Sequence, residues 1–436
     1  MVVPPSPQTS PSAPATGLEV RPFRALTYRQ RDPEHLARVS SPAYDLVTAT
    51  GRDRLADADP HNIVRLILPR LDPSADGSVA DPAQQAAATL TDWLDQDVLE
   101  RDPEPALWLY EMTPPGGAPT TLGWLGAVGL PAAGSAAVLP HEDTFPGAVE
   151  GRRALLAATA TDLEPIVLAH DADAEIAELT ASAALAEPTL EITDDDGVRH
   201  RLRRFTDATL LASLRSAFAR TGAVIADGHH RFAAARANAR SQSSTHGSDA
   251  ILALVTPMGP GGLRVDAIHR VVPDLDLDAA IGAAGRGFTA SDVPVAGWGE
   301  AEAAIVRWLA DPERGEFLLT DGRRLVRLFA PTPEVAATVP AEAPSSWRGL
   351  DVVLAHHGLF TALWGRRDDP DSVLIAHTVA EALRIARERS GIAVLLRPPS
   401  PADVADVARA GARMPRKSTL FVPKPRTGLV LRPLDD

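Results

Sequence analysis

Short apolar runs recur along the chain with helical patterning between them, and this alternation constrains the fold more than any other sequence feature. Pro or Gly stands near the ends of these runs, which favours buried strands over helices. In the first two thirds of the chain the runs are residues 63–68, 106–110, 124–130, 223–226 and 251–255. Strands that alternate with helices predict an α/β or α+β fold.

The same alternation continues in the last third, where we expect strands at residues 317–320, 325–329, 373–376 and 392–396. A chain of 436 residues is too long for one ordinary domain, and we therefore expect two. The sequence pattern changes near residue 275, and we place the domain boundary there. We predict a disordered Pro-rich tail at 1–17, an N-terminal domain at 18–275 and a C-terminal α/β domain at 276–436.

Composition and charge exclude several classes of protein. The formal net charge of −14 argues against a nucleic-acid-coating role, since neutralising phosphates requires a basic surface. No apolar stretch approaches 18 residues, so we expect no membrane partner. The absence of cysteine excludes thiolate nucleophiles and Cys-ligated metals. The N-terminus does not have the pattern of a signal peptide, and we expect a cytoplasmic protein.

The strongest local signal is a strand–turn–helix junction, residues 224–231, with the sequence Val-Ile-Ala-Asp-Gly-His-His-Arg. Gly228 can adopt a positive φ, and the free N–H groups of the following helix favour an anion. Arg231 lies one turn into that helix and can make a bidentate contact with phosphate. His229 and His230 can donate to phosphate oxygens or carry protons. An N-cap role for Asp227 beside surface histidines is the structural alternative.

A second group of polar residues lies in a Pro-bounded loop that contains His141, Glu142 and Asp143. A histidine and two carboxylates can supply a general base or bind a divalent cation. Solvated loop charges are the alternative interpretation. Adjacent histidines at 229 and 230 have poor spacing for ligands on one helix face, which disfavours zinc.

Two early segments form a third group. Tyr44 and Asp45 follow an X-Pro turn, and Asn62 and Arg65 lie in or beside the apolar run 63–68. An arginine inside an apolar strand must reach a partner or solvent, and Asn62 can cap or bind a ligand. An ordinary turn and a solvent-facing strand charge explain the pattern about as well.

The fourth group contains the only two lysines in the chain, Lys417 and Lys424. Because arginine replaces lysine elsewhere, a retained lysine suggests a need for a compact ammonium charge. Ser418 and Thr419 follow directly in a loop stiffened by prolines, and these groups can grip a phosphate or carboxylate. The glycines of a Walker A loop are missing before Lys417.

These segments, in this order, resemble the bacterial and archaeal domain-of-unknown-function family numbered 1015. The resemblance runs from Arg21-Pro22-Phe23 through the His141-Glu142 and Asp227–Arg231 segments to Met414–Thr419 and Gly428. The Asp-Gly-His-His-Arg turn is also similar to the phosphate-binding turn of the ParB/sulfiredoxin superfamily, which includes nucleotide-dependent free-serine kinases. The resemblance implies an N-terminal ParB/sulfiredoxin-like mixed-sheet domain followed by the C-terminal α/β domain.

The predicted function is a small-molecule phosphotransferase, a nucleotide-dependent kinase of a free amino acid such as serine, with ATP or ADP as donor and Mg²⁺ bridging the phosphates. A phosphohydrolase acting on a phosphorylated amino acid and a non-enzymatic nucleotide-gated binding protein are the alternatives. No metal ligand is assigned, and a homo-oligomer stays open.

The predicted roles are as follows. Phosphates would be held by Gly228, His229, His230 and Arg231. Catalytic roles are predicted for Glu142, Asp227, His230 and Lys417, with Glu142 as the first candidate to accept the substrate proton and Asp45 or Asp227 as the others. Substrate contacts are predicted for Tyr44, Asp45, Asn62, Arg65, His141, Ser418, Thr419 and Lys424.

Overall fold

The structure is a computed structural model, and it describes residues 17–70, 81–132, 134–241, 247–259, 261–311, 313–367 and 369–435. The chain forms two compact units. Unit 1 comprises Met1–Leu139, Thr144–Pro257 and Pro425–Asp436, and unit 2 comprises Pro140–Asp143 and Met258–Lys424. The predicted Pro-rich tail lies, up to residue 16, outside the described residues.

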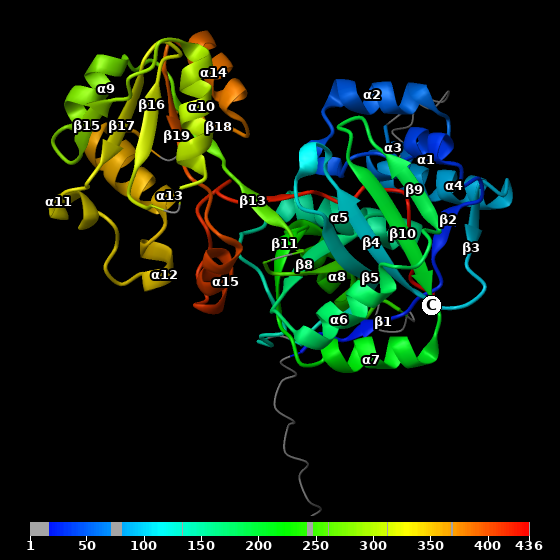
Figure 1. The fold of residues 1–436 in the computed structure, drawn as a ribbon. Helices are drawn as coiled ribbons and strands as arrows, with labels where there is room; N and C mark the ends of the chain where they lie inside the picture. Colours follow the sequence, from blue (N-terminus) through cyan, green and yellow to red (C-terminus); the bar gives the residue numbers. More distant parts are fainter. Residues whose placement is uncertain are drawn as a thin grey trace, which may run out of the picture. The chain divides into compact units, whose positions relative to one another are not determined.

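Unit 1 is built on a nine-stranded sheet with the order β6-β11-β8-β12-β5-β4-β10-β9, and β1 pairs with β5 (Figure 1). The pairs β6–β11 and β8–β12 are parallel and the other pairs are antiparallel, so the sheet is mixed, as predicted. The strands are β1 (Val20–Arg21), β4 (Leu107–Thr113), β5 (Thr121–Gly129), β6 (Val138–Leu139), β8 (Ile166–His170), β9 (Leu190–Thr193), β10 (Arg199–Phe205), β11 (Ala223–Asp227) and β12 (Ala250–Pro257).

Helices pack on this sheet and bury one continuous apolar core. The helix α8 contacts β8 and β12, α5 packs on α8, and α7 contacts β1. Phe218 of α7 and Phe232 of α8 belong to the same core as Trp124 and Ile225. The helices are α1 (Pro33–Val39), η1 (Tyr44–Leu46), α2 (Ala49–Ala58), α3 (Val64–Ile67), α4 (Pro82–Asp95), η2 (Pro115–Gly117), α5 (Pro146–Thr159), α6 (Ala174–Ala183), α7 (Ala208–Phe218) and α8 (His229–Ser241).

Two small ribbons complete unit 1. The strand β2 (Leu26–Tyr28) pairs with β3 (Leu99–Arg101), and β7 (Thr161–Asp162) pairs with β21 (Arg432–Pro433). The second ribbon matters for the site, because it joins the last residues of the chain to the segment that follows α5.

One predicted strand is wrong. Residues 63–68 contain the short helix α3, which begins where the Oδ1 atom of Asn62 accepts the N–H of Val64 at 2.9 Å. Burial on several sides explains the error, because an apolar run of this length fits a buried helix as well as a buried strand. The other four runs of the first two thirds form β4, β5, β11 and β12, as predicted.

Unit 2 is a three-layer structure around a six-stranded sheet with the order β15-β17-β16-β19-β14-β18. All its pairings are antiparallel. Phe317 and Leu319 pack with α9 on one face, while Leu318, between them, packs with α10 and α14 on the other. Figure 1 shows the strands between α9 on one side and α10 and α14 on the other.

The predicted strands of the last third correspond to β16, β17, β18 and β19. The sheet strands are β14 (His269–Val272), β15 (Thr289–Asp292), β16 (Phe317–Thr320), β17 (Leu325–Phe329), β18 (Leu374–Ala376) and β19 (Ile392–Leu395), and β13 (Arg264–Asp266) pairs separately with β20 (Leu420–Val422). The helices are α9 (Leu277–Ala284), α10 (Trp298–Leu309), α11 (Pro333–Ala336), α12 (Ser345–Arg348), α13 (Asp351–Leu354), the π-helix η3 (Ala355–Leu363), α14 (Val379–Glu388) and α15 (Pro401–Arg409).

Together these observations confirm the predicted fold class, which combines a mixed-sheet N-terminal unit with a second unit of helices and strands. Among the described residues, none of the helices has the length and apolar character needed to cross a membrane.

Candidate functional site

The predicted turn joins a buried strand directly to a helix. Strand β11 ends at Asp227, Gly228 follows with φ +93°, and the Gly228 carbonyl accepts the N–H of Phe232 at 2.9 Å as α8 begins. A Cβ atom at Gly228 would lie 2.7 Å from Cγ2 of Ile166. Positive φ and this close approach together require glycine here.

Arg231 is fixed at the start of α8 by two oxygens. Its Nη2 atom lies 2.5 Å from Oδ2 of Asp227, and its Nη1 donates to the carbonyl of Pro165 at 2.5 Å. Burial acts to lower the pKa of Arg231, but the negative charges of Glu164 and Asp227 outweigh it, and the pKa is raised. The side chain is therefore a permanent, positioned cation.

A second arginine, Arg152, contacts the same aromatic ring as Arg231. The Cζ atom of Arg152, on α5, lies 4.2 Å from the centre of the Tyr44 ring, and that of Arg231 lies 5.7 Å from it. Cations at these distances from a ring face are attracted by its quadrupole. Burial raises the pKa of the Tyr44 hydroxyl, and the two guanidinium charges oppose this shift.

A buried carboxylate, Glu164, faces this pair of arginines. It lies 4.0 Å from Arg152, and its Oε1 accepts the backbone N–H of Tyr44 at 3.0 Å and the hydroxyl of Thr427 at 3.2 Å. The residue is only 6% exposed. Its burial raises the pKa of the carboxyl despite the opposing charges of Arg231 and Arg152.

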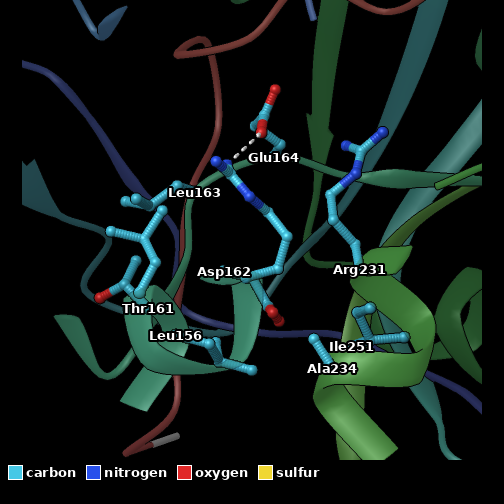
Figure 2. A pocket seen from close by; sticks show the side chains of 10 residues that line it. Leu156, Thr161, Asp162, Leu163, Glu164, Arg231, Ala234 and Ile251 are labelled. Atoms are coloured by element: carbon cyan, nitrogen blue, oxygen red, sulfur yellow. Dashed lines mark ion pairs between the residues drawn. The ribbon is translucent and has the colours of Figure 1, made fainter. Parts of the chain in front are cut away.

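These groups line a small pocket of about 40 Å³. Figure 2 shows Glu164 and Arg231 toward one end, while Leu156, Ala234 and Ile251 lie at the other. Such a volume holds only a few water molecules. The pocket therefore has room for one small group only. The lining residues are Arg152, Leu155, Leu156, Thr161, Asp162, Leu163, Glu164, Arg231, Ala234 and Ile251.

The C-terminal segment holds this pocket together from within unit 1. Asp162 accepts the N–H of Leu252 and a hydrogen bond from Nη1 of Arg432, each at 2.8 Å. Asp162 is buried, and burial raises the pKa of its carboxyl against the charge of Arg432. Gly428 has φ +96°, and a Cβ there would lie 2.9 Å from Ile63, so this segment also passes too closely for any other residue.

The two histidines of the turn have different surroundings. His229 is buried at 7% exposure. His230 accepts the backbone N–H of Phe145 on its Nε2 atom at 3.2 Å, and the two rings stack with centroids 5.9 Å apart and planes 16° apart. The hydrogen bond leaves Nδ1 as the protonated nitrogen in neutral His230.

The sequence profile of a family described as "protein of unknown function (DUF1015)" matches residues 20–353. The chain belongs to the DUF1015 family. This match confirms the predicted family resemblance. The matched residues include the turn at Asp227 and end before the lysine-containing loop at 414–424. No curated protein sequence matches this DUF1015 protein.

Several solved structures resemble the DUF1015 protein weakly. A free serine kinase in complex with AMP is 13% identical, with a TM-score of 0.30, and the match covers 66% of this chain and 84% of that one. SbnI with a C-terminal truncation, from Staphylococcus aureus, is 12% identical, with a TM-score of 0.36 and coverages of 71% and 87%. A conserved hypothetical protein from Pyrococcus furiosus is 13% identical, with a TM-score of 0.31 and coverages of 69% and 93%. Likenesses this low assign no residue roles.

Of the predicted site residues in the DUF1015 protein, the structure brings one group together. Tyr44 lies beneath both arginines, and Asp45 beside it contributes to the raised pKa of Arg231. These residues therefore join Asp227, Gly228 and Arg231 at one place in unit 1.

Two other predicted substrate-binding residues have contacts that serve the fold. The Asn62 amide donates to the carbonyls of Arg38 at 2.6 Å and Ser40 at 3.1 Å while its oxygen caps α3. Arg65 is on α3 rather than on a strand, and its Nη2 donates to the carbonyl of Ala56 at 2.7 Å. Both residues therefore connect neighbouring helices of unit 1.

The remaining predicted residues belong to unit 2, where His141, Glu142 and Thr419 contact one another. Thr419 lies 3.0 Å from Nε2 of the buried His141, and its hydroxyl donates to Oε1 of Glu142 at 3.0 Å. The Ser418 hydroxyl donates to the carbonyl of Pro415 at 2.7 Å. Lys417, at φ +50°, and Lys424 belong to the same unit. The catalytic and substrate-binding roles of these residues stay predictions.

The sequence analysis predicted no role for Glu164, Thr427 or Arg152. A signal for Glu164 exists, because it is a lone acid in the apolar segment Leu163–Ile166. A carboxylate in such surroundings must find cations or donors when it is buried. Within the described ranges, no group of three or more His, Asp or Glu residues is arranged to hold a metal ion.

Proposed function

We propose that this protein is a phosphotransferase that binds a nucleotide by its phosphates at the turn between β11 and α8. The observation that carries the proposal is the convergence of Arg152 and Arg231 on the Tyr44 ring at the start of that helix. Two guanidinium groups and a helix N-terminus both favour phosphate. The pocket volume of about 40 Å³ suits one phosphoryl-sized group.

Phosphoryl transfer requires positioning and charge neutralisation more than covalent chemistry, and the two guanidinium groups would contribute to both. Asp45 is the proton acceptor that we favour in unit 1, because it is exposed and directly follows Tyr44, whose ring contacts both arginines. Mg²⁺ would accompany the nucleotide, whose phosphates supply most of its oxygen ligands. ATP or ADP as donor and a free amino acid such as serine as acceptor complete the proposal.

The binding test uses three arginine variants. Calorimetric titration with ATP, ADP and pyrophosphate is expected to show a loss of roughly 10- to 100-fold in affinity for R152A and R231A, the cost of one charged hydrogen bond. R153A is the matched control, because Arg153 is next to Arg152 on α5 but pairs with the exposed Glu150. Unchanged binding in R231A would remove the phosphate site from this turn.

The reaction test separates the proposed kinase from its alternatives. Wild-type protein is incubated with ATP or ADP and a panel of free amino acids, and phosphorylated products are measured by mass spectrometry. A phosphoamino acid formed only with nucleotide present supports the kinase. Phosphate released from phosphoserine without nucleotide would instead identify a phosphohydrolase, and tight nucleotide binding without any product a binding protein.

A further inference from the structure

An exposed aromatic ring lies beside the proposed phosphate site. Phe145 is 67% exposed, although it is a large apolar residue. It immediately precedes α5, the helix that carries Arg152. Its ring stacks on His230, the neighbour of Arg231 in α8. The ring therefore contacts the first turn of α8, which also carries Arg231.

A hydrogen bond and ring stacking hold Phe145 and His230 together. The Phe145 N–H donates to Nε2 of His230 at 3.2 Å, and the two planes differ by only 16°. His230 is anchored by α8, which starts at His229. His230 therefore covers part of the Phe145 ring, and the rest of the ring is exposed to another flat group.

The small volume of the pocket limits which part of a nucleotide can enter it. A cavity of about 40 Å³ has no room for a ribose or a base, so those parts must lie outside it. An exposed aromatic ring next to a phosphate site supplies the surface that a base requires, since bases stack on aromatic side chains.

We infer that Phe145, supported by His230, is the platform on which the nucleotide base stacks. This inference rests on the proposed function and adds the side chain that contacts the base of the nucleotide. Because every base has a π-face, stacking alone discriminates little among bases. The site therefore accepts both purine and pyrimidine nucleotides.

The test compares a ligand that has a base with one that lacks it. Calorimetry with ADP and with pyrophosphate, both in the presence of Mg²⁺, is done on wild type, F145A, F145W and L185A. Loss of one stacked base is expected to weaken ADP binding roughly 5- to 100-fold in F145A, with pyrophosphate unchanged. F145W retains or tightens ADP binding. L185A, which alters another exposed apolar residue at 87% exposure, changes neither.

Each outcome decides between the two claims. A loss confined to ADP in F145A, with F145W at least as tight as wild type, supports the platform. Equal loss for both ligands, or no loss for either, overturns the platform while phosphate binding stands. If wild type binds neither ADP nor pyrophosphate, the proposed function fails and the platform fails with it. Circular dichroism checks that F145A is folded. If F145A unfolds, the comparison of F145W with wild type still tests the platform.

Discussion

Thr427 donates its hydroxyl to Oε1 of Glu164 at 3.2 Å, although the two residues are 263 positions apart in sequence. The backbone holds the contact, since Thr427 and Ser41 exchange hydrogen bonds at 3.1 and 2.9 Å. The same Glu164 oxygen accepts the N–H of Tyr44. The last residues of the chain thus position the carboxylate that faces Arg152 and Arg231.

Removing that hydroxyl is expected to weaken the protein modestly. Thr427→Val keeps the shape of the buried side chain and deletes one donor to Glu164, which costs about 1 kcal/mol in the free energy of unfolding. Urea denaturation measures this change. Thr91→Val, on the exposed face of α4, is the control and should cost less. Equal losses for the two variants would show that the Glu164 contact contributes nothing.

The turn glycine is expected to tolerate no side chain. Gly228→Ala places a Cβ 2.7 Å from Ile166 at φ +93°, so we expect a loss of at least about 2 kcal/mol in unfolding free energy. Gly151→Ala, in the middle of α5 with open space around it, should instead gain about 0.5–1 kcal/mol. Thermal and urea unfolding distinguish the two. A Gly228→Ala protein as stable as wild type would refute the geometry of the turn.

Glu164 should make stability depend on pH in a defined direction. Burial raises the pKa of its carboxyl above the usual 4.5, so the folded chain holds this proton more tightly than the unfolded chain. The resulting stabilisation is present below the unfolded pKa and is lost as the pH rises through the folded pKa. Glu164→Gln abolishes this titration. From pH 4.5 towards neutrality, wild type should therefore lose unfolding free energy relative to the variant.

Urea unfolding across that pH range measures the difference between the two proteins. The buried Asp162 titrates in both proteins and cancels. Glu150→Gln is the control, because hydrogen bonding to Arg153 lowers the pKa of the exposed Glu150 and reverses the direction of the trend. A pH-independent difference between wild type and Glu164→Gln would contradict the raised pKa.

A buried hydrogen-bonded chain connects the β9–β10 turn to the C-terminal segment. Asp194 Oδ2 lies 3.0 Å from Nε2 of His200, whose Nδ1 lies 2.9 Å from the Tyr110 hydroxyl, and Tyr110 accepts the N–H of Arg426 at 2.9 Å. Burial acts to raise the pKa of Asp194, but its hydrogen bonds with His200 and Val198 outweigh this and lower it.

Asp194→Asn should therefore cost about 1.5–3 kcal/mol in unfolding free energy at neutral pH, the range for hydrogen bonds to a charged group. Since the native pKa is lowered, this stability is present above the unfolded pKa and is lost as the pH falls through the folded one. Asp195→Asn, an exposed neighbour, should change little. Denaturation of both variants at neutral and acidic pH checks the prediction, and similar losses in both would contradict it.

Local sequence predicted the turn because its determinants are local. The apolar strand, the glycine that tolerates positive φ and the helix start at His229 are contiguous, and each acts on its nearest neighbours. For the same reason four strands of the nine-stranded sheet and four of the six-stranded sheet were predicted. At residues 63–68 the local pattern predicted a strand and was wrong, because burial on several sides removes the periodicity that distinguishes a helix from a strand. Only the Asn62 cap pointed to a helix.

The sequence alone determined that Asp227, Gly228 and Arg231 form a strand–helix junction. Only the tertiary structure decided that Tyr44, Arg152, Glu164 and Thr427 meet there. Those residues lie on separate segments, and long-range pairing and packing bring them together. The lone Glu164 gives no local sign of its partners, because the cations that stabilise a buried carboxylate are specified by the fold and not by its neighbours in sequence.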